Sequence, residues 1–218
     1  MIRNWKYFSP RGSIGELHIA NHQYMTGNMV GILLTGYEHI EDSPRNVCNA
    51  KAFDFPVRYK IVDGADIDNE LRLKIKELEL EGCRFIATSG GVFGLYYETI
   101  RDCTTLPVLA TPLQILNFAG LSHAREKKIC IINELSSEQN STVFDALSID
   151  ESMRSRCIFI DAGSESIRDL PKDIGAIVWD QPSRSKQPIA MNVPVFDMLK
   201  LIGMMKRSVA QRPFGGEI

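Results

Sequence analysis

The sequence predicts an α/β protein made of two similar Rossmann-like halves, each with a mostly parallel sheet. Apolar runs of strand length alternate with helix-compatible segments, which is the pattern of a parallel sheet covered by helices. Two runs, MVGILLT at 29–35 and KKICIIN at 127–133, are almost continuously apolar, as strands buried on both faces are. Each run is followed by a later strand that ends abruptly in polar or small residues, at 85–91 and at 176–182, which indicates a duplication.

The first half contains four expected strands, at 29–35, 55–62, 85–87 and 107–111. Between the second and third strands, either Asp66 or Asp68 can cap a helix that runs through Glu81. One face of that helix is apolar and carries Ile67, Leu71, Ile75 and Leu78. A second helix-compatible segment, 92–102, follows the third strand, and Pro112 fits the first turn of a helix after the fourth.

The second half repeats this alternation, with expected strands at 127–133, 156–161, 176–179 and 193–196. A weak helix is expected at 141–147, a short helix or loop at 164–170, and a final helix from an Asp197 cap to about Gln211. We expect a pseudo-two-fold axis between the halves, with a ligand cleft between them. The expected division is an extension at 1–28, a first domain at 29–115 plus 195–218, and a second domain at 116–194.

The N-terminal extension at 1–28 differs in composition from the rest of the chain. It lacks clear periodicity and mixes the aromatic residues Trp5, Tyr7 and Phe8 with a turn signal at 9–12. We interpret it as an irregular or short-stranded segment that packs either on the body or on another subunit. In the second case the protein would be a homo-oligomer. A mobile tail is the alternative, although the aromatic residues argue against full disorder.

The composition excludes several classes of partner. A net charge of −2 on 218 residues gives no general field for nucleic acid or anionic membrane. No run approaches the roughly 18 apolar residues of a membrane span, and the N-terminus lacks the apolar core of a secretory signal. The five cysteines are scattered without metal-ligand spacing, so we expect reduced thiols, a cytoplasmic location and no metal.

The stretch FIATSGG at 85–91 is the first candidate for a binding site. An apolar strand stops there at hydroxyl and glycine residues, and a helix-compatible segment follows. Ligands bind at the carboxyl ends of parallel strands, where backbone N–H groups at a helix N-terminus can hold an anion. An ordinary glycine-rich turn without a ligand is an equally good interpretation of the same residues.

Four segments together give the chain a family resemblance. They are VGILL at 30–34, NAKAFDFPVRYKIVDGA at 49–65, EGCRFIATSGG at 81–91 with PVLATPL at 107–113, and DIGAIVWDQP at 173–182 with VPVFDML at 193–199. In order and spacing they resemble the aspartate/glutamate racemase superfamily over roughly residues 29–212. The resemblance implies two α/β domains with the substrate between them and chemistry that needs no cofactor. It also implies two cysteines, one from each domain, on opposite faces of the substrate α-carbon.

The sequence departs from the family at both of these cysteines. The first family cysteine follows Thr-Ser and precedes Gly, and Gly90 occupies this place. The second follows an acidic residue after its strand, and Gln181, next to Asp180, occupies that place. Neither glycine nor glutamine can carry the transferred proton, so racemisation through two thiols at these positions is excluded.

Two other residues are candidates for acid–base chemistry. Asp180 ends a buried strand beside the expected cleft, where burial raises the pKa of a carboxyl; a simple turn with Pro182 is the alternative. Cys48 lies in the polar loop RNVCN, which can approach the cleft, although a plain loop role is the favoured interpretation. The remaining cysteines fit structural burial as small apolar side chains: Cys83, Cys103, Cys130 and Cys157.

Ligand binding should be better preserved than catalysis. The expected strand ends offer hydroxyls and backbone amides that can hold a carboxylate, at Thr35, Gly36, Thr88, Ser89, Gly91 and Thr111. Asn49 matches an asparagine of the family.

The sequence thus supports three functional hypotheses. The first is a racemase-like protein that binds a small carboxylate, such as an amino acid or dicarboxylate, and whose acid–base chemistry is altered or lost. The second is a cofactor-independent lyase or isomerase that acts on a dicarboxylate with Asp180 as the base. The third is a non-catalytic ligand sensor or assembly protein in which residues 1–28 form the interaction segment.

Overall fold

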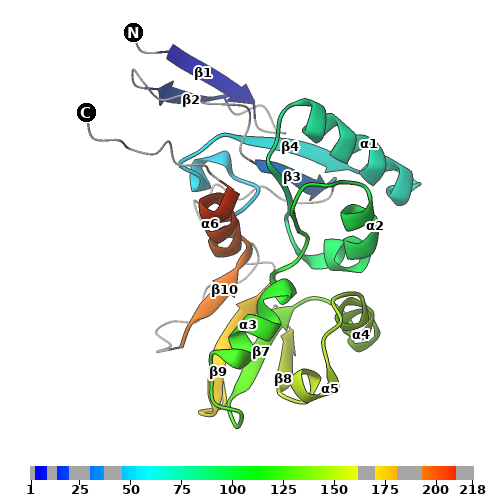
Figure 1. The fold of residues 1–218 in the computed structure, drawn as a ribbon, viewed down its shortest axis with the longest axis vertical. Helices are drawn as coiled ribbons and strands as arrows, with labels where there is room; N and C mark the ends of the chain where they lie inside the picture. Colours follow the sequence, from blue (N-terminus) through cyan, green and yellow to red (C-terminus); the bar gives the residue numbers. More distant parts are fainter. Residues whose placement is uncertain are drawn as a thin grey trace.

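The computed structural model describes residues 3–8, 14–19, 30–36, 46–161, 170–180 and 193–209. Two four-stranded sheets with only parallel pairs form the body of the molecule, and Figure 1 shows one above the other. The first sheet has the order β4-β3-β5-β6. Its strands are β3 (Val30–Thr35), β4 (Val57–Val62), β5 (Phe85–Thr88) and β6 (Val108–Leu109).

The second sheet repeats the topology of the first. Read from its β8 edge, its order is β8-β7-β9-β10. Its strands are β7 (Lys128–Asn133), β8 (Cys157–Asp161), β9 (Ile174–Trp179) and β10 (Val195–Asp197). In each half the first strand pairs with the second and the third, and the fourth pairs with the third. The predicted α/β fold with two similar parallel-sheet halves is confirmed.

The helices of the first half largely follow the predicted segments. They are η1 (Ala50–Ala52), α1 (Ile67–Leu80), η2 (Gly91–Tyr96), α2 (Tyr97–Asp102), η3 (Pro112–Ile115) and α3 (Leu116–Leu121). α1 starts where predicted, because the Asp66 side chain accepts a hydrogen bond from Asn69 N. The predicted helix at 92–102 is confirmed in position but begins as the tighter 3-10 helix η2.

The helices of the second half depart more from the sequence prediction. They are α4 (Ser137–Ala146), α5 (Glu151–Arg154) and α6 (Met198–Val209). α4 begins earlier than the predicted 141–147, because Ser136 and Gln139 form a reciprocal capping box. α5 was not predicted, since a four-residue helix shows no periodicity. The helix or loop predicted at 164–170 lies almost entirely outside the described residues.

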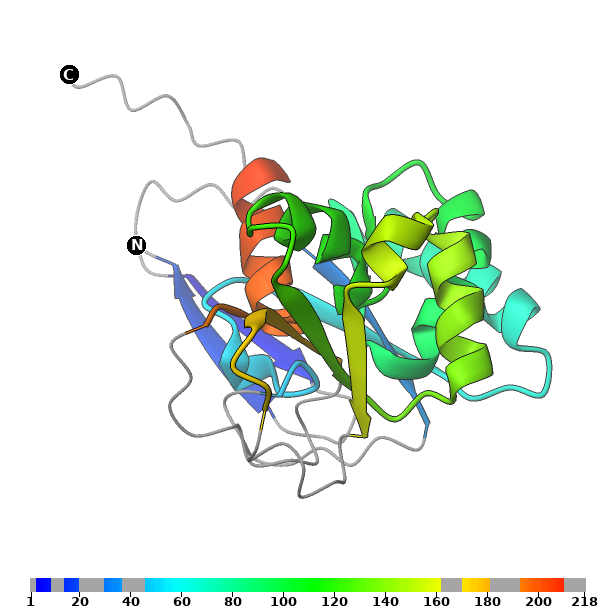
Figure 2. The same cartoon turned by 90° about the horizontal axis from the view of Figure 1, so that it is seen from below.

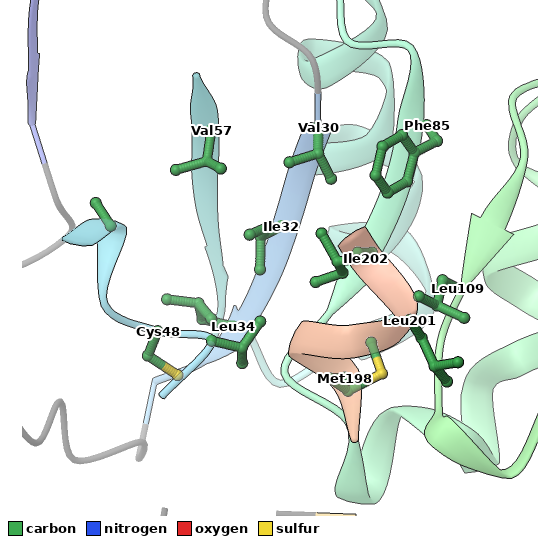
Figure 3. Packing of buried hydrophobic residues seen from close by; sticks show 13 residues of the cluster. Val30, Ile32, Leu34, Cys48, Val57, Phe85, Leu109, Met198, Leu201 and Ile202 are labelled. Atoms are coloured by element: carbon green, nitrogen blue, oxygen red, sulfur yellow. The ribbon is translucent and has the colours of Figure 1, made fainter. Parts of the chain in front are cut away.

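The helix after the fourth strand of each half packs on the sheet of the other half. Met198, Leu201 and Ile202 of α6 are buried against the first sheet (Figure 3), in a cluster that includes Val30, Ile32, Leu34, Phe85 and Leu109. Residues of η3 and α3 are buried against the second sheet, in a cluster that includes Leu113, Leu116, Ala119, Ile129, Ile131 and Val178. Both halves therefore share their cores, and this burial fixes the ends of β6 and β10 near one another.

The packing of these helices on the sheet of the other half bears on the predicted domain division. Residues 195–218 were expected in the first half, but Val195–Asp197 pair with β9 in the second sheet. α6, which follows at once, packs on the first sheet. The domain division itself stays a prediction.

The N-terminal extension contains two strands. β1 (Arg3–Phe8) and β2 (Ile14–Ile19) form an antiparallel pair, which agrees with a short-stranded extension. The figures show this hairpin beside the first sheet, on the side of α6 (Figures 1 and 2). Its expected role in contacting another subunit stays a prediction. Within the described ranges, no helix is both long and apolar enough to cross a membrane.

Candidate functional site

The two sheets meet at a buried carboxylate. Asp180 directly follows β9 of the second half, and its side chain is fully buried. Its Oδ1 accepts a hydrogen bond of 2.6 Å from Gly91 N, and its Oδ2 accepts one of 3.1 Å from Thr111 Oγ1. Both donors belong to the first half, after β5 and β6. The predicted strand ends therefore come together, and three predicted site residues touch.

Asp180 and Ser89 occupy equivalent backbone positions in the two halves. Asp180 N donates to Ile132 O at 2.9 Å, and Ser89 N donates to Leu33 O at 3.0 Å. In each half, then, the residue after the third strand adds one more hydrogen bond to the first strand. By this register Ser89 corresponds to Asp180. In the sequence the next residues are Gly90 and Gln181, the two positions at which the family resemblance implies cysteines. Gln181 lies outside the described residues.

Gly90 turns the chain from β5 into η2. Its φ of 87° lies in a region that side chains other than glycine rarely adopt. A Cβ on this residue would lie within 3.0 Å of Asp180 Oδ1 and 3.3 Å from Met198 Cγ. The Asp180 carboxylate thus occupies the space that a side chain at position 90 would need. A cysteine at this position is incompatible with Asp180 as it stands.

The two threonines of the site have different roles. Thr111 is fully buried and caps η3, since its Oγ1 accepts a hydrogen bond from Leu113 N and donates to Asp180. Thr88 Oγ1 donates to Ala110 O at 2.7 Å and accepts from Gly90 N at 2.9 Å. Thr88 therefore fixes the loop internally, whereas Thr111 directs its hydroxyl proton at the carboxylate.

The carboxylate of Asp180 has no positive partner in the part of the chain that the structure describes. No cation among the described residues pairs with it, and its hydrogen bonds come from one amide and one neutral hydroxyl. Burial raises its pKa from 3.8 to about 6, although the hydrogen bonds from Gly91 and Thr111 act in the opposite direction. A carboxyl with this pKa exists in both protonation states close to neutral pH, as acid–base groups in enzymes do.

The cysteines that the structure describes do not form a thiol pair at this junction. Burial raises the pKa of the Cys83 and Cys130 thiols to about 12 and that of Cys157 to about 11, so they hold their protons. The pKa of the half-buried Cys103 thiol is also raised by burial. Cys48 is only 4% exposed, because the predicted polar loop folds into the core beside Leu34 (Figure 3).

The remaining predicted residues lie further from the carboxylate's hydrogen bonds. Thr35 is half-buried and Gly36 exposed at the carboxyl end of β3, and neither donates to Asp180. The Asn49 side chain accepts a hydrogen bond from Lys51 N and so caps η1. Sequence reasoning missed Asn46 in the same loop: its Nδ2 group is buried and lacks an acceptor, and a buried unpaired donor is a candidate ligand contact.

A metal centre is not indicated in the part of the chain that the structure covers. No group of three or more His, Cys, Asp or Glu side chains there could hold a metal ion. The junction offers one carboxylate, one amide and one hydroxyl, which is a set suited to proton exchange or to holding a carboxylic acid.

Comparison with known proteins supports the fold. No protein-family model and no curated protein sequence matches the chain. Solved structures do match: an aspartate racemase homologue from Pyrococcus horikoshii is 13% identical, with a TM-score of 0.51 over 83% of this chain and 99% of that one. Arylmalonate decarboxylase is 12% identical, with a TM-score of 0.53 over 85% of this chain and 95% of that one. The chain therefore shares the fold of these two proteins.

Proposed function

We propose that this protein binds a small organic carboxylate at the junction of its two sheets and is not a two-thiol racemase. The observation that carries the proposal is the way in which Asp180 is held. Gly91 N–H and the Thr111 hydroxyl converge on one carboxylate from the other half of the molecule. Donors in this arrangement suit the carboxylate of an amino acid or dicarboxylate as well as that of a side chain.

The thiols argue against the usual chemistry of the superfamily. Position 90 has no side chain, and a Cβ there would collide with Asp180. A thiol with a pKa of about 12, such as that of Cys130, is ionised in roughly one molecule in 10⁵ at neutral pH. Such thiols cannot take a proton from a carbon acid at a useful rate, because the thiolate is the reactive form.

A binding experiment tests the carboxylate site. Acetate, malonate and both enantiomers of aspartate are titrated into the protein at about pH 5.5 and followed by calorimetry and thermal unfolding. At 100 times its dissociation constant a bound ligand stabilises a protein by about 2.7 kcal/mol. Thr111→Val should weaken binding about tenfold or more, because one hydrogen bond to a charged group is lost. Thr111→Ser keeps the hydroxyl and is the matched control.

The result that contradicts the proposal is equally definite. If no carboxylate in this panel binds, or if Thr111→Val binds as tightly as Thr111→Ser, the junction is not a carboxylate site. Deuterium exchange at the α-carbon of the same amino acids is measured in parallel, and no exchange through a thiol pair is expected.

A second candidate function is supported by the protonation behaviour of Asp180. Its raised pKa, about 6, suits a single acid–base group in a lyase or isomerase that acts on a dicarboxylate. Turnover of a dicarboxylate panel should then be lost in Asp180→Asn, which preserves shape but removes the titrating group. Turnover that survives in Asp180→Asn would rule out this role.

A further inference from the structure

The carboxylate site is already occupied by a group of the protein itself. Gly91 N–H and the Thr111 hydroxyl each have a single proton to donate, and both are directed at Asp180. The neighbouring backbone donors are engaged too, since Ser89 N donates to Leu33 O and Gly90 N to Thr88 Oγ1. A carboxylate that arrives from outside therefore finds no unused donor at the tip of β5.

Among the described residues, no free positive charge lies beside Asp180 to hold a second anion. Of the elements that the structure describes, η2 and β7 form hydrogen bonds with Asp180, η3 is capped by a residue that does, and Met198 of α6 lies with Asp180 against Gly90. Residues of η2 and η3 carry no charge, and the charged residues nearest the start of α6 are Asp197 and Lys200, which pair with each other at 3.7 Å. Two carboxylates that share these donors cannot both remain ionised.

We infer that Asp180 is the internal occupant of the carboxylate site, and that an external carboxylate takes over the Gly91 and Thr111 donors only when Asp180 binds a proton. This inference rests on the proposed function. Ligand binding then consumes one proton, which stays on the Asp180 carboxyl. The neutral acid no longer repels the ligand and can donate its own hydrogen bond to it.

The consequence is a defined pH dependence of affinity. Below the pKa of Asp180, which is about 6, the carboxyl is already protonated and affinity for an ionised ligand is constant. Above it, each pH unit raises the dissociation constant about tenfold, because one proton must be taken up. Between about pH 6 and pH 8 the affinity for acetate should fall about 50-fold, because half of the carboxyl is already ionised at pH 6.

Removal of the occupant provides the sharpest test. Asp180→Ala vacates the donors, so acetate should bind and stabilise this variant, with an affinity that stays constant over about pH 6 to 8. Acetamide, a neutral analogue of similar shape, should stabilise it much less. Asp150→Ala is the matched control: Asp150 also accepts from a backbone amide, Met153 N, but lies in an exposed cap, so acetate should not stabilise that variant.

A measurement on the wild-type protein keeps the inference testable if Asp180→Ala does not fold. Calorimetry of acetate binding at about pH 7.5, in two buffers with different ionisation heats, should report the uptake of nearly one proton. Acetate affinity that does not change with pH in the wild type, with no proton uptake, overturns the inference and leaves the carboxylate proposal intact. Equal stabilisation of Asp180→Ala by acetamide also overturns it. Failure of acetate and every larger carboxylate to bind either protein overturns both.

Discussion

The substitution Gly90→Ala probes the junction most directly. It adds a single methyl group at a residue whose φ is 87°, directly against the Asp180 carboxylate. A cysteine would present the same Cβ atom, so alanine separates the steric effect from the chemistry of sulfur. The prediction is a strong loss of stability that depends on Asp180.

The size of the loss follows from two contributions. A side chain in this backbone region costs about 1–3 kcal/mol. The methyl group must also push Asp180 from Gly91 and Thr111, and a hydrogen bond to a charged group contributes about 1.5–3 kcal/mol. Partial relaxation recovers part of this, so we expect Gly90→Ala to lower the free energy of unfolding by about 3–5 kcal/mol.

Urea denaturation of four proteins measures this effect: the wild type, Gly90→Ala, Asp180→Ala and the double variant. When Asp180 is already replaced by alanine, Gly90→Ala costs only the backbone strain. The effects of the two substitutions on the free energy of unfolding should therefore be coupled by about 1.5 kcal/mol or more. Gly203→Ala is the control, because a Cβ there meets nothing within 4 Å in α6; it should stabilise by about 0.5–1 kcal/mol. Additive effects, or a loss below about 1 kcal/mol in Gly90→Ala, would refute the reasoning.

Three further predictions concern stability and assembly. Burial raises the pKa of Asp180 from 3.8 to about 6, so between these pH values the folded protein holds a proton that the unfolded chain releases. The free energy of unfolding should therefore fall by about 3 kcal/mol as the pH rises from 3.8 to about 6. Asp180→Asn should lack this fall in urea titrations over the same range; an unchanged pH profile would contradict the assignment. Native Cys130 should resist a thiol reagent at about pH 8, because its sulfur is buried and protonated, whereas labelling as fast as in urea would place it at the surface. Deletion of residues 1–28 should lower the oligomeric mass in light scattering if the hairpin is an assembly segment, and an unchanged mass would remove that hypothesis.

The fold could be read from the sequence because its signals are local. Buried parallel strands such as β3 and β7 are short apolar runs. The Asp66 and Asp197 side chains cap their helices by accepting hydrogen bonds from backbone N–H groups only three residues later. α5 was missed because a single turn leaves no periodic pattern. The strand ends of the site were predicted for the same reason, since polar and small residues mark where each apolar run stops.

The contacts that make the site could not be read in this way. Gly91 and Asp180 are 89 residues apart, and Thr111 and Asp180 are 69 apart. These residues come together where α6 packs on the first sheet and α3 packs on the second sheet. No local sequence pattern encodes this packing. Cys48 shows the same limit, since its loop has polar neighbours in sequence but folds into the core by tertiary packing.

The geometry also explains why the residues at positions 90 and 180 belong together. A thiol at position 90 requires the space in which Asp180 Oδ1 lies, and Asp180 requires a residue without a side chain at that point. The glycine is the condition under which a carboxylate of one half can reach the amide and hydroxyl of the other. Gly90→Cys alone should leave a strained junction with a displaced carboxylate. A working thiol at this position would need a second change that removes Asp180, since the two groups compete for the same volume and the same donors.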